Sequence, residues 1–462
     1  MMLGVLIRRE ILAHVLSLRF AVTFVLFILL IFASLFVTVN AHRQDREEYD
    51  ARVRASRDHL ADILAEKDEE RMWDRLFWDE GVDYAAQPPP LAWLGQGLSQ
   101  AWPGALSTTS EGARSVDRGL TRNPLLGLLR VPDFVYIVNA VLSLLAILFM
   151  FDSVCGEKES GTLRLVLSNP VPRHLILLGK WIAGYTVLMV PFLIAVAGGL
   201  GYAWVRGALA PSADAFARVL ALVAVAALYV AAFFNISLFV SATTFRPATA
   251  LLVCLLVWVA AIIVIPNLGP VTAHILRPTP SRKSIDTAKR AVDQEMDLKI
   301  QRLTLTSGEL AYGSTVEHSK EKLEQERRQR KREFDAYYQA RQDEQLDLAR
   351  TLGRLSPAAC WTYAAVALAG TGPAAYERFR RARETLSTQF ASYVESMVAQ
   401  AQKMQWRERP KIRAEEIPAF RPAFPDTADA FGSALNDMLI LLIVSVAFFM
   451  LGFLFFVRYD AR

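Results

Sequence analysis

Six segments of the chain are long and apolar enough to cross a membrane, and this feature limits what the chain can fold into. The segments are residues 20–39, 133–152, 176–204, 216–242, 247–265 and 435–457. A helix needs about 20 apolar residues to cross a hydrocarbon layer of roughly 30 Å. We therefore predict an all-α, polytopic membrane protein with six transmembrane helices. The hydrophobic share of 53% across 462 residues agrees with this prediction.

The first segment follows a basic N-terminal region, as the apolar part of a signal peptide does. Signal peptides carry only about 7–15 apolar residues before a cleavage site of small residues. Residues 20–39 are longer and lead directly into charged residues. We therefore predict a retained transmembrane helix.

Lys and Arg in short loops indicate which side of the membrane each loop occupies, because such loops resist translocation. These residues lie before the first segment, between the second and third or in the first turns of the third, between the fourth and fifth, and after the sixth. They are Arg8, Arg9, Arg19, Lys158, Arg164, Arg173, Lys180, Arg246, Arg458 and Arg462. We therefore expect a multi-pass protein of the inner (plasma) membrane with both termini in the cytoplasm, including a short tail at residues 458–462.

This orientation places two long loops, residues 40–132 and 266–434, outside the cytoplasm, where we predict a large helical domain. Residues 281–304 and 316–352 have the spacing and charge of long paired helices. Residues 358–370 are apolar but too short to span, which favours an interfacial or core helix. Residues 104–119 contain Ser and Gly and are predicted to be a loop.

Residues 1–19 are predicted to form a cytoplasmic interface helix. Apolar residues lie along one stripe, while Arg8, Arg9 and Glu10 lie elsewhere. Such a helix is either an anchor at the membrane surface or a surface on which a cytoplasmic partner acts, and the sequence leaves both open.

No motif supports an enzyme, so no catalytic residue is predicted. Gly179 and Lys180 are followed by Trp181 and lack the preceding glycine of a nucleotide-binding loop. The six histidines and three cysteines show no spacing typical of a metal site, and no two cysteines can form a disulfide. The net charge of +5 is explained by cytoplasmic loops and anionic lipid, without a nucleic-acid partner.

The predicted spans contain few ionisable groups, which argues against a proton- or ion-coupled transporter. Four milder polar residues remain: Asn139, Tyr185, Tyr229 and Asn235. They either line a path or form hydrogen bonds between helices, and both interpretations stay open.

The loop at residues 153–175 is the most informative segment. An acidic and basic group precedes Gly161, Thr162 and Leu163, and a proline, Arg173 and then Gly179–Lys180 follow. This pattern resembles the cytoplasmic loop of ABC-2 type transporter permeases. Gly161 can end one short helix and Thr162 can cap the next, so that Leu163, Leu165 and Leu167 form an apolar face for a partner's groove.

The resemblance implies that this loop contacts a separate ATPase. The residues implied in coupling are Glu157, Lys158, Glu159, Gly161, Thr162, Leu163, Leu165, Leu167, Pro170 and Arg173. It also implies that ATP and Mg bind the ATPase chains rather than this one, and that two permease chains form the membrane unit. The N-terminal helix with Glu10 and the six-span plan extend the resemblance to ABC-2 permeases, and residues 355–372 resemble the subgroup with a large outer helical insertion, the DUF3526 group.

The expected function is therefore a permease subunit of an ATP-driven exporter. A rival is mechanotransmission, in which the outer helices act on an extracytoplasmic partner and nothing crosses the bilayer. The sequence leaves open the substrate, the choice between these functions, and whether the second permease chain is a copy or a paralogue.

Overall fold

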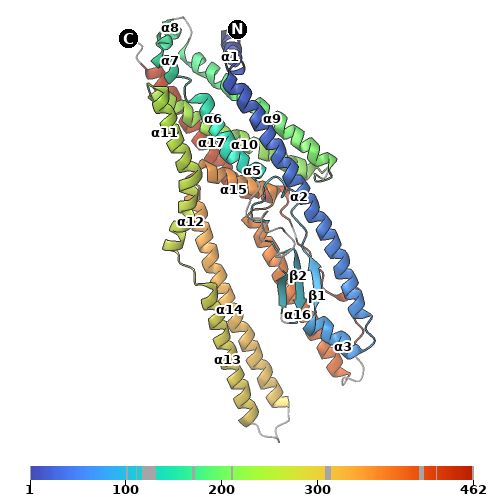
Figure 1. Ribbon diagram of the computed structural model, residues 1–462. Helices are drawn as coiled ribbons and strands as arrows, with labels where there is room; N and C mark the ends of the chain where they lie inside the picture. Colours follow the sequence, from blue (N-terminus) through green and yellow to red (C-terminus); the bar gives the residue numbers. More distant parts are fainter. Residues whose placement is uncertain are drawn as a thin grey trace. The chain divides into compact units, whose positions relative to one another are not determined.

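The computed structural model describes residues 2–99, 102–110, 112–116, 132–168, 172–209, 212–306, 314–404, 410–422 and 424–459. The chain divides into two compact units. The first unit comprises Met1–Trp258 and Cys360–Arg462, and the second comprises Val259–Ala359. Figure 1 shows the elements of both.

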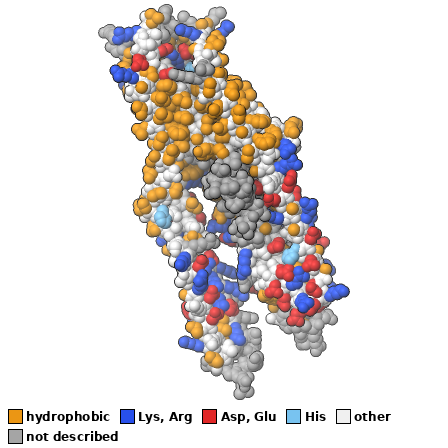
Figure 2. Space-filling model, viewed as in Figure 1, with side chains coloured by type: hydrophobic (Ala, Val, Ile, Leu, Met, Phe, Trp, Pro, Cys, Tyr) orange, Lys and Arg blue, Asp and Glu red, His pale blue; other side chains and the backbone are white. Residues whose placement is uncertain are grey.

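The described residues contain six helices long and apolar enough to cross a membrane, at the six predicted places. They are α2 (Leu18–Leu64), the run α5 (Phe134–Ile137), η3 (Val138–Leu142) and α6 (Ser143–Met150), α9 (Arg173–Val205), α10 (Ala213–Thr243), the run beginning with α11 (Pro247–Val259), and α17 (Thr427–Arg458). The predicted all-α, six-span fold is confirmed. Hydrophobic side chains gather over these spans in Figure 2.

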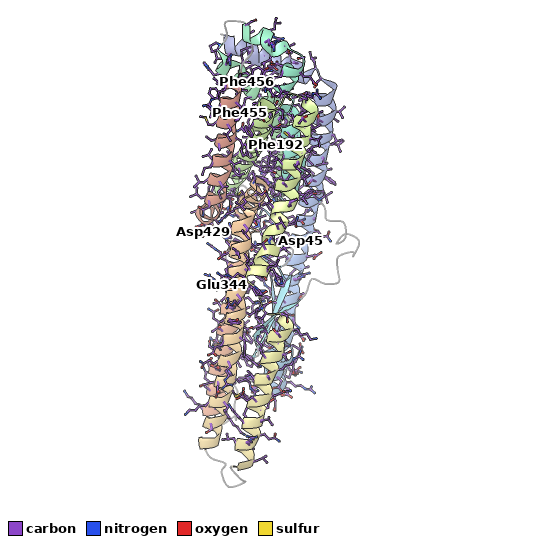
Figure 3. The ribbon with its side chains drawn as sticks, turned by 90° about the vertical axis from the view of Figure 1, so that its left-hand side faces the viewer. Asp45, Phe192, Glu344, Asp429, Phe455 and Phe456 are labelled. Atoms are coloured by element: carbon purple, nitrogen blue, oxygen red, sulfur yellow. The ribbon has the colours of Figure 1, made fainter. Side chains whose placement is uncertain are left out.

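Both described ends of the chain lie at the same end of the first unit (Figure 1). Helix α1 (Met2–Val15) and the last turn of α17 are found there, together with α7 (Cys155–Glu159) and α8 (Thr162–Ser168). We call this the termini end. In Figure 3, Phe456 of α17 lies toward this end, whereas Asp429 lies at the opposite end of the same helix.

Helix α2 extends far beyond the predicted span. It runs unbroken for 47 residues because it contains no glycine or proline. Phe27, Ile31, Leu35 and Val39 recur every fourth residue and are buried, so the apolar half packs along one stripe. Ile63, near the far end, belongs to a different hydrophobic core. The predicted boundary at residue 39 therefore marks the end of the apolar part of α2, and the helix itself continues to Leu64.

The part of the first unit that lies away from the termini end, around residues 60–116 and 373–420, combines helices with a small sheet, and we call it the head. Strands β1 (Val82–Ala85), β2 (Ala105–Thr109) and β3 (Gly112–Val116) form an antiparallel sheet in that order. The prediction of a loop at residues 104–119 is wrong for the two later strands. Leu106 and Thr108 alternate toward the interior, but five residues of alternation are a weak signal until a neighbouring strand pairs with them.

Helices enclose this sheet. Helix α2 packs against β1, η1 (Arg75–Asp79) against β2, and α16 (Pro373–Lys403) against β2 and β3. Helix α3 (Glu69–Asp74) precedes η1 and contributes Trp73 to the same core as Phe77 of η1. Trp73, Phe77 and Phe390 form the centre of one core, and Trp102 stacks on Phe379 with ring centroids 5.1 Å apart in another. Trp73 and Phe77 pack edge to face in the first of these cores, with ring centroids 5.2 Å apart. A short helix η5 (Ala414–Glu416) precedes the return to α17.

The short apolar helix α15 (Pro357–Ala369) is a core helix. Its residues from Cys360 onward are mostly buried in the first unit. The indole of Trp361 donates a hydrogen bond of 3.0 Å to the carbonyl oxygen of Val135 and stacks on Tyr229. Of the two interpretations of this segment, the structure favours the core helix.

The second unit consists of the π-helix η4 (Ala260–Val264), α12 (Ile265–Leu276), α13 (Arg282–Thr306), α14 (Ser314–Gly353) and the start of α15. Helix α12 packs against the end of α14, where a Cβ on Gly269 would lie 3.0 Å from the carbonyl oxygen of Ala349. Helices α13 and α14 form an antiparallel hairpin (Figure 1). The predicted pairing of two long charged helices is confirmed.

Candidate functional site

The loop between α6 and α9 folds into two short helices, α7 and α8. Gly161 separates them with a φ of 74°, a left-handed conformation that glycine adopts readily. Helix α8 begins at Thr162, whose hydroxyl oxygen lies 2.8 Å from that of Ser160. The predicted helix break is therefore present. Pro170 lies outside the described residues.

The leucines of α8 do not share one face, so this part of the prediction is wrong. Leu163 is fully buried within the chain, whereas Leu165 is 72% exposed. Each residue of a helix is rotated by roughly 100° from the one before it, so residues two apart point to nearly opposite sides. The side chain of Leu167 lies outside the described residues. Of the two leucines whose side chains are described, a partner can therefore reach Leu165, and Glu159, two residues before Gly161, is also exposed.

Lys180, in the second turn of α9, joins the loop to the N-terminal helix. Its ammonium nitrogen lies 2.7 Å from Oε1 of Glu157 and 3.6 Å from Oε1 of Glu10. The Lys180 side chain is only 9% exposed, and the two carboxylates are about one quarter exposed. Ion pairs shielded from water are screened less than surface pairs. Three elements, α1, α7 and α9, therefore meet at one ammonium group.

Helix α1 packs closely on α9 next to this cluster. A Cβ on Gly179 would lie 3.4 Å from Cβ of Leu6, so the absence of a side chain lets the two helices approach. Glu10 points toward Lys180, while Arg8 and Arg9 are exposed. His14 is partly buried on the same helix, and burial lowers the pKa of its imidazole. Of the three predicted interface residues, Glu10 therefore makes a contact within the chain, whereas Arg8 and Arg9 lie on the exposed surface.

Lys158 fixes α7 to the end of α10. Its ammonium donates hydrogen bonds of 2.5 and 3.1 Å to the carbonyl oxygens of Ala242 and Thr244. It also lies over the rings of Phe245 and Tyr459, about 5 Å from each centroid. A cation at a helix C-terminus satisfies carbonyls that have no partner within the helix.

Arg173 makes the same kind of contact with the last span. Its guanidinium donates to the carbonyl oxygens of Val457 and Tyr459 at 2.8 and 2.9 Å. The backbone amides of Val154 and Cys155 also donate to Ser241 Oγ on α10, at 3.0 and 3.2 Å. The loop is therefore connected to α1, α9, α10 and α17 by directional contacts.

Comparison with known proteins agrees with this arrangement. The family model described as "ABC-2 family transporter protein" matches residues 5–461. The chain belongs to the ABC-2 transporter family. A segment of 94 residues is also 33% identical to "Probable ABC transporter permease protein NosY" of Stutzerimonas stutzeri, covering 20% of this chain and 30% of that relative. The chain is thus an ABC-2 family protein with six described helices that are long and apolar enough to cross a membrane.

In this ABC-2 transporter subunit, the four polar residues of the spans are hydrogen-bonded between helices. The Tyr229 hydroxyl lies 2.8 and 2.9 Å from the carbonyl and side-chain oxygens of Asn139, a residue of the π-helix η3. The Tyr185 hydroxyl donates to the carbonyl oxygen of Ala227 at 2.7 Å. These contacts favour the interhelical interpretation.

Asn235 connects three spans of the ABC-2 subunit. Its Oδ1 accepts a hydrogen bond of 2.6 Å from the indole of Trp181 on α9. Its amide donates to the carbonyl and hydroxyl oxygens of Ser445 on α17, both at 2.9 Å. Asn235 itself is 3% exposed. A role for these residues in lining a path stays a prediction.

Sequence reasoning did not select Lys180 or Ser241 as site residues of the ABC-2 subunit. The position of Lys180 inside a predicted span could have indicated its role, because a lysine within a span needs an acidic partner. No local pattern indicates the role of Ser241, because that role depends on two backbone amides some 86 residues away. Among the described residues, no group of three His, Cys, Asp or Glu side chains is arranged to hold a metal ion.

Proposed function

We propose that this chain is the permease subunit of an ATP-driven exporter and receives the motion of separate ATPase subunits through α7 and α8. ATP and Mg would be held by those ATPase chains. The observation that carries this proposal is the set of cationic contacts made by Lys180, Lys158 and Arg173. Because these contacts join the loop to α1, α9, α10 and α17, a force on α8 would move these helices together.

The surroundings of the subunit are part of the same proposal. We place both termini, α7 and α8 in the cytoplasm and the head outside, on the distribution of Lys and Arg in short loops. The chain would pair with a second permease copy or a paralogue in the inner (plasma) membrane. The similar protein of Stutzerimonas stutzeri carries the name of a permease protein, which supports a role within a multi-subunit transporter. The large outer helical region supports placement in the DUF3526-like subgroup.

Co-purification tests the proposal. The full chain, expressed with its genomic neighbours, should bring down a protein with a nucleotide-binding loop, and Leu165→Asp should weaken this assembly because Leu165 is exposed on α8. Ser168→Ala, at another exposed residue of α8 that lies outside the implied coupling residues, is the control and should assemble normally. Purification of the wild-type chain without any such ATPase would overturn the proposal.

A second candidate function is mechanotransmission, and helix α2 favours it. One unbroken helix packs against the spans through Phe27 and Ile31 and enters the core of the head at Ile63. A rigid helix of this length can carry motion from the spans to an outer domain. This candidate shares the ATPase partner but needs no transported substrate.

Hydrogen exchange of the head separates the two candidates. Mechanotransmission expects exchange in β1 and α16 to change when ATP and vanadate trap the ATPase, and expects Ala51→Pro in α2 to abolish that change. Ala51 is exposed, so Ala51→Ser is a matched control that leaves the helix intact. A head whose exchange is insensitive to trapped nucleotide excludes mechanotransmission and leaves export.

A further inference from the structure

Helix α2 has a second apolar side, opposite the stripe of Phe27 and Leu35 that faces α9. Val22, Leu26 and Leu29 lie on this second side and are between 57% and 65% exposed. They recur every three or four residues, as residues on one side of a helix do. Because this part of α2 is one of the six candidate spans, the medium that meets these side chains is the hydrocarbon of a bilayer.

A groove with a volume of about 910 Å³ runs along this side of α2. It extends from Ala21 to Val37 on α2, and Pro132 and Ile137 belong to its other wall. Helices α2 and α5 are neighbours in Figure 1. The helix rises by about 24 Å between Ala21 and Val37, so the groove follows α2 through most of a hydrocarbon core of roughly 30 Å.

The lining of the groove selects an apolar occupant. Among the described residues that line it, Ser34 is the one with a polar side chain. Ser34 is 6% exposed, and its hydroxyl already donates a hydrogen bond of 2.5 Å to the carbonyl oxygen of Pro132. A polar ligand would give up its hydrogen bonds to water in this groove without replacement. An apolar chain gives up none.

The size of the groove distinguishes between two apolar occupants, a helix and a lipid chain. A helix is about 10 Å in diameter, so a length of 24 Å takes up roughly 1,900 Å³, about twice the volume of the groove. A methylene group takes up roughly the volume of a water molecule, about 30 Å³, so the groove has room for about 30 methylenes, or two acyl chains of about 15 carbons. Acyl chains can therefore fill the groove, whereas a helix would leave about half of its volume outside.

We propose that this groove binds acyl chains of bilayer phospholipids, one from each leaflet. A leaflet supplies roughly 15 Å of hydrocarbon, half of the core, and the groove is longer than that. The bound chains would fill the space between α2 and residues 132–137, which the hydrogen bond of Ser34 closes only near Val37. This binding depends only on α2 crossing a membrane and goes beyond the proposed function.

Photo-cross-linking with a lipid probe tests the proposal. The full chain is placed in nanodiscs of phosphatidylethanolamine and phosphatidylglycerol that contain a small fraction of phosphatidylethanolamine with a diazirine in one acyl chain. Residues 439–446 of α17 are the reference surface, because Leu439, Leu442, Ile443 and Val446 are also half-exposed on a span. We expect several-fold more label on residues 21–37 than on this reference. Equal labelling of the two surfaces would overturn the proposal.

Two matched variants show whether the label depends on the groove. Ala33→Phe places a large side chain in the groove, so most of the label on residues 21–37 should be lost. Ala197→Phe is the control, because Ala197 is exposed on α9 and does not line the groove, and it should keep the label. Thermal unfolding of both variants confirms that they are folded. Full labelling of folded Ala33→Phe would contradict the proposal.

A photoreactive residue in the groove identifies the occupant without a lipid probe. Benzoylphenylalanine replaces Leu29, which is 65% exposed and lines the groove. After illumination in the same nanodiscs, mass spectrometry should find phospholipid attached at position 29. Attachment to a second copy of the chain, or to another segment of the same chain, would identify a protein occupant and overturn the proposal. Co-purification of an ATPase is measured separately, so failure of the groove and failure of the proposed function remain distinguishable.

Discussion

The ammonium of Lys180 lies 2.7 Å from the carboxylate of Glu157, and this contact joins the start of α9 to α7, 23 positions earlier in the chain. Glu10 approaches the same ammonium from α1. Since Lys180 is almost entirely shielded, removal of its charge leaves two carboxylates facing each other without a cation.

We therefore expect Lys180→Met to destabilise the protein by about 3 kcal/mol, the scale measured when one partner of a buried ion pair is lost. The melting temperature in detergent should fall accordingly. Glu159→Gln is the control, because Glu159 is exposed on the same loop, and it should melt like the wild type. An unchanged melting temperature in Lys180→Met would show that the three-element contact contributes nothing to stability.

The different burial of Leu163 and Leu165 predicts two different defects. Leu163→Asp places a carboxylate in a fully buried position, so the chain itself should lose several kcal/mol of stability and be produced in low yield. Leu165→Asp should leave the melting temperature unchanged, because the side chain is exposed, and should weaken ATPase binding instead. Pull-down and thermal unfolding of both variants measure this split. Equal behaviour of the two variants would contradict it.

His14 predicts that the docking of α1 depends on pH. Burial lowers the pKa of His14 below its ordinary value of 6.5; Glu10 and Asp152 partly oppose this effect, and Lys180 adds to it. The unfolded or undocked chain then takes up the proton first. The contribution of neutral His14 is therefore fully present above pH 6.5 and is lost as the pH falls toward the lowered pKa.

Hydrogen exchange of residues 3–15 between about pH 5 and pH 7, corrected for intrinsic rates, measures this loosening. Exchange in α1 should rise on acidification. His14→Gln cannot titrate and should remove the pH dependence without loosening α1 at pH 7. A variant that keeps the wild-type pH profile would assign the effect to another group.

The contact of Tyr229 with Asn139 predicts the cost of losing an interhelical hydrogen bond. Tyr229→Phe removes only the hydroxyl and leaves the half-buried Asn139 side chain without that partner, a loss of about 1 kcal/mol, the usual net contribution of such a hydrogen bond. Thermal unfolding of the purified complex measures it. Tyr136→Phe is the control, because Tyr136, on the span that carries Asn139, is 58% exposed. If Tyr229 lines a path instead, ATPase stimulation by substrate should change while the melting temperature does not.

The sequence by itself determined the features that depend on a local pattern. Each span is visible in its own run of apolar residues because the bilayer acts on every segment separately. The hairpin of α13 and α14 follows from helical spacing and charge in the same way. Gly161 was predictable as a helix break because its conformational freedom is a property of one residue.

Only the tertiary structure decided the features that join distant segments. Lys180 meets Glu10 across 170 positions of the chain, and no spacing rule connects them. Strands β2 and β3 are too short to be recognised before β1 pairs with β2. The burial of Leu163 and exposure of Leu165 depend on how α8 lies against its neighbours. In each case the deciding free energy comes from a contact between residues far apart in sequence, which local composition does not encode.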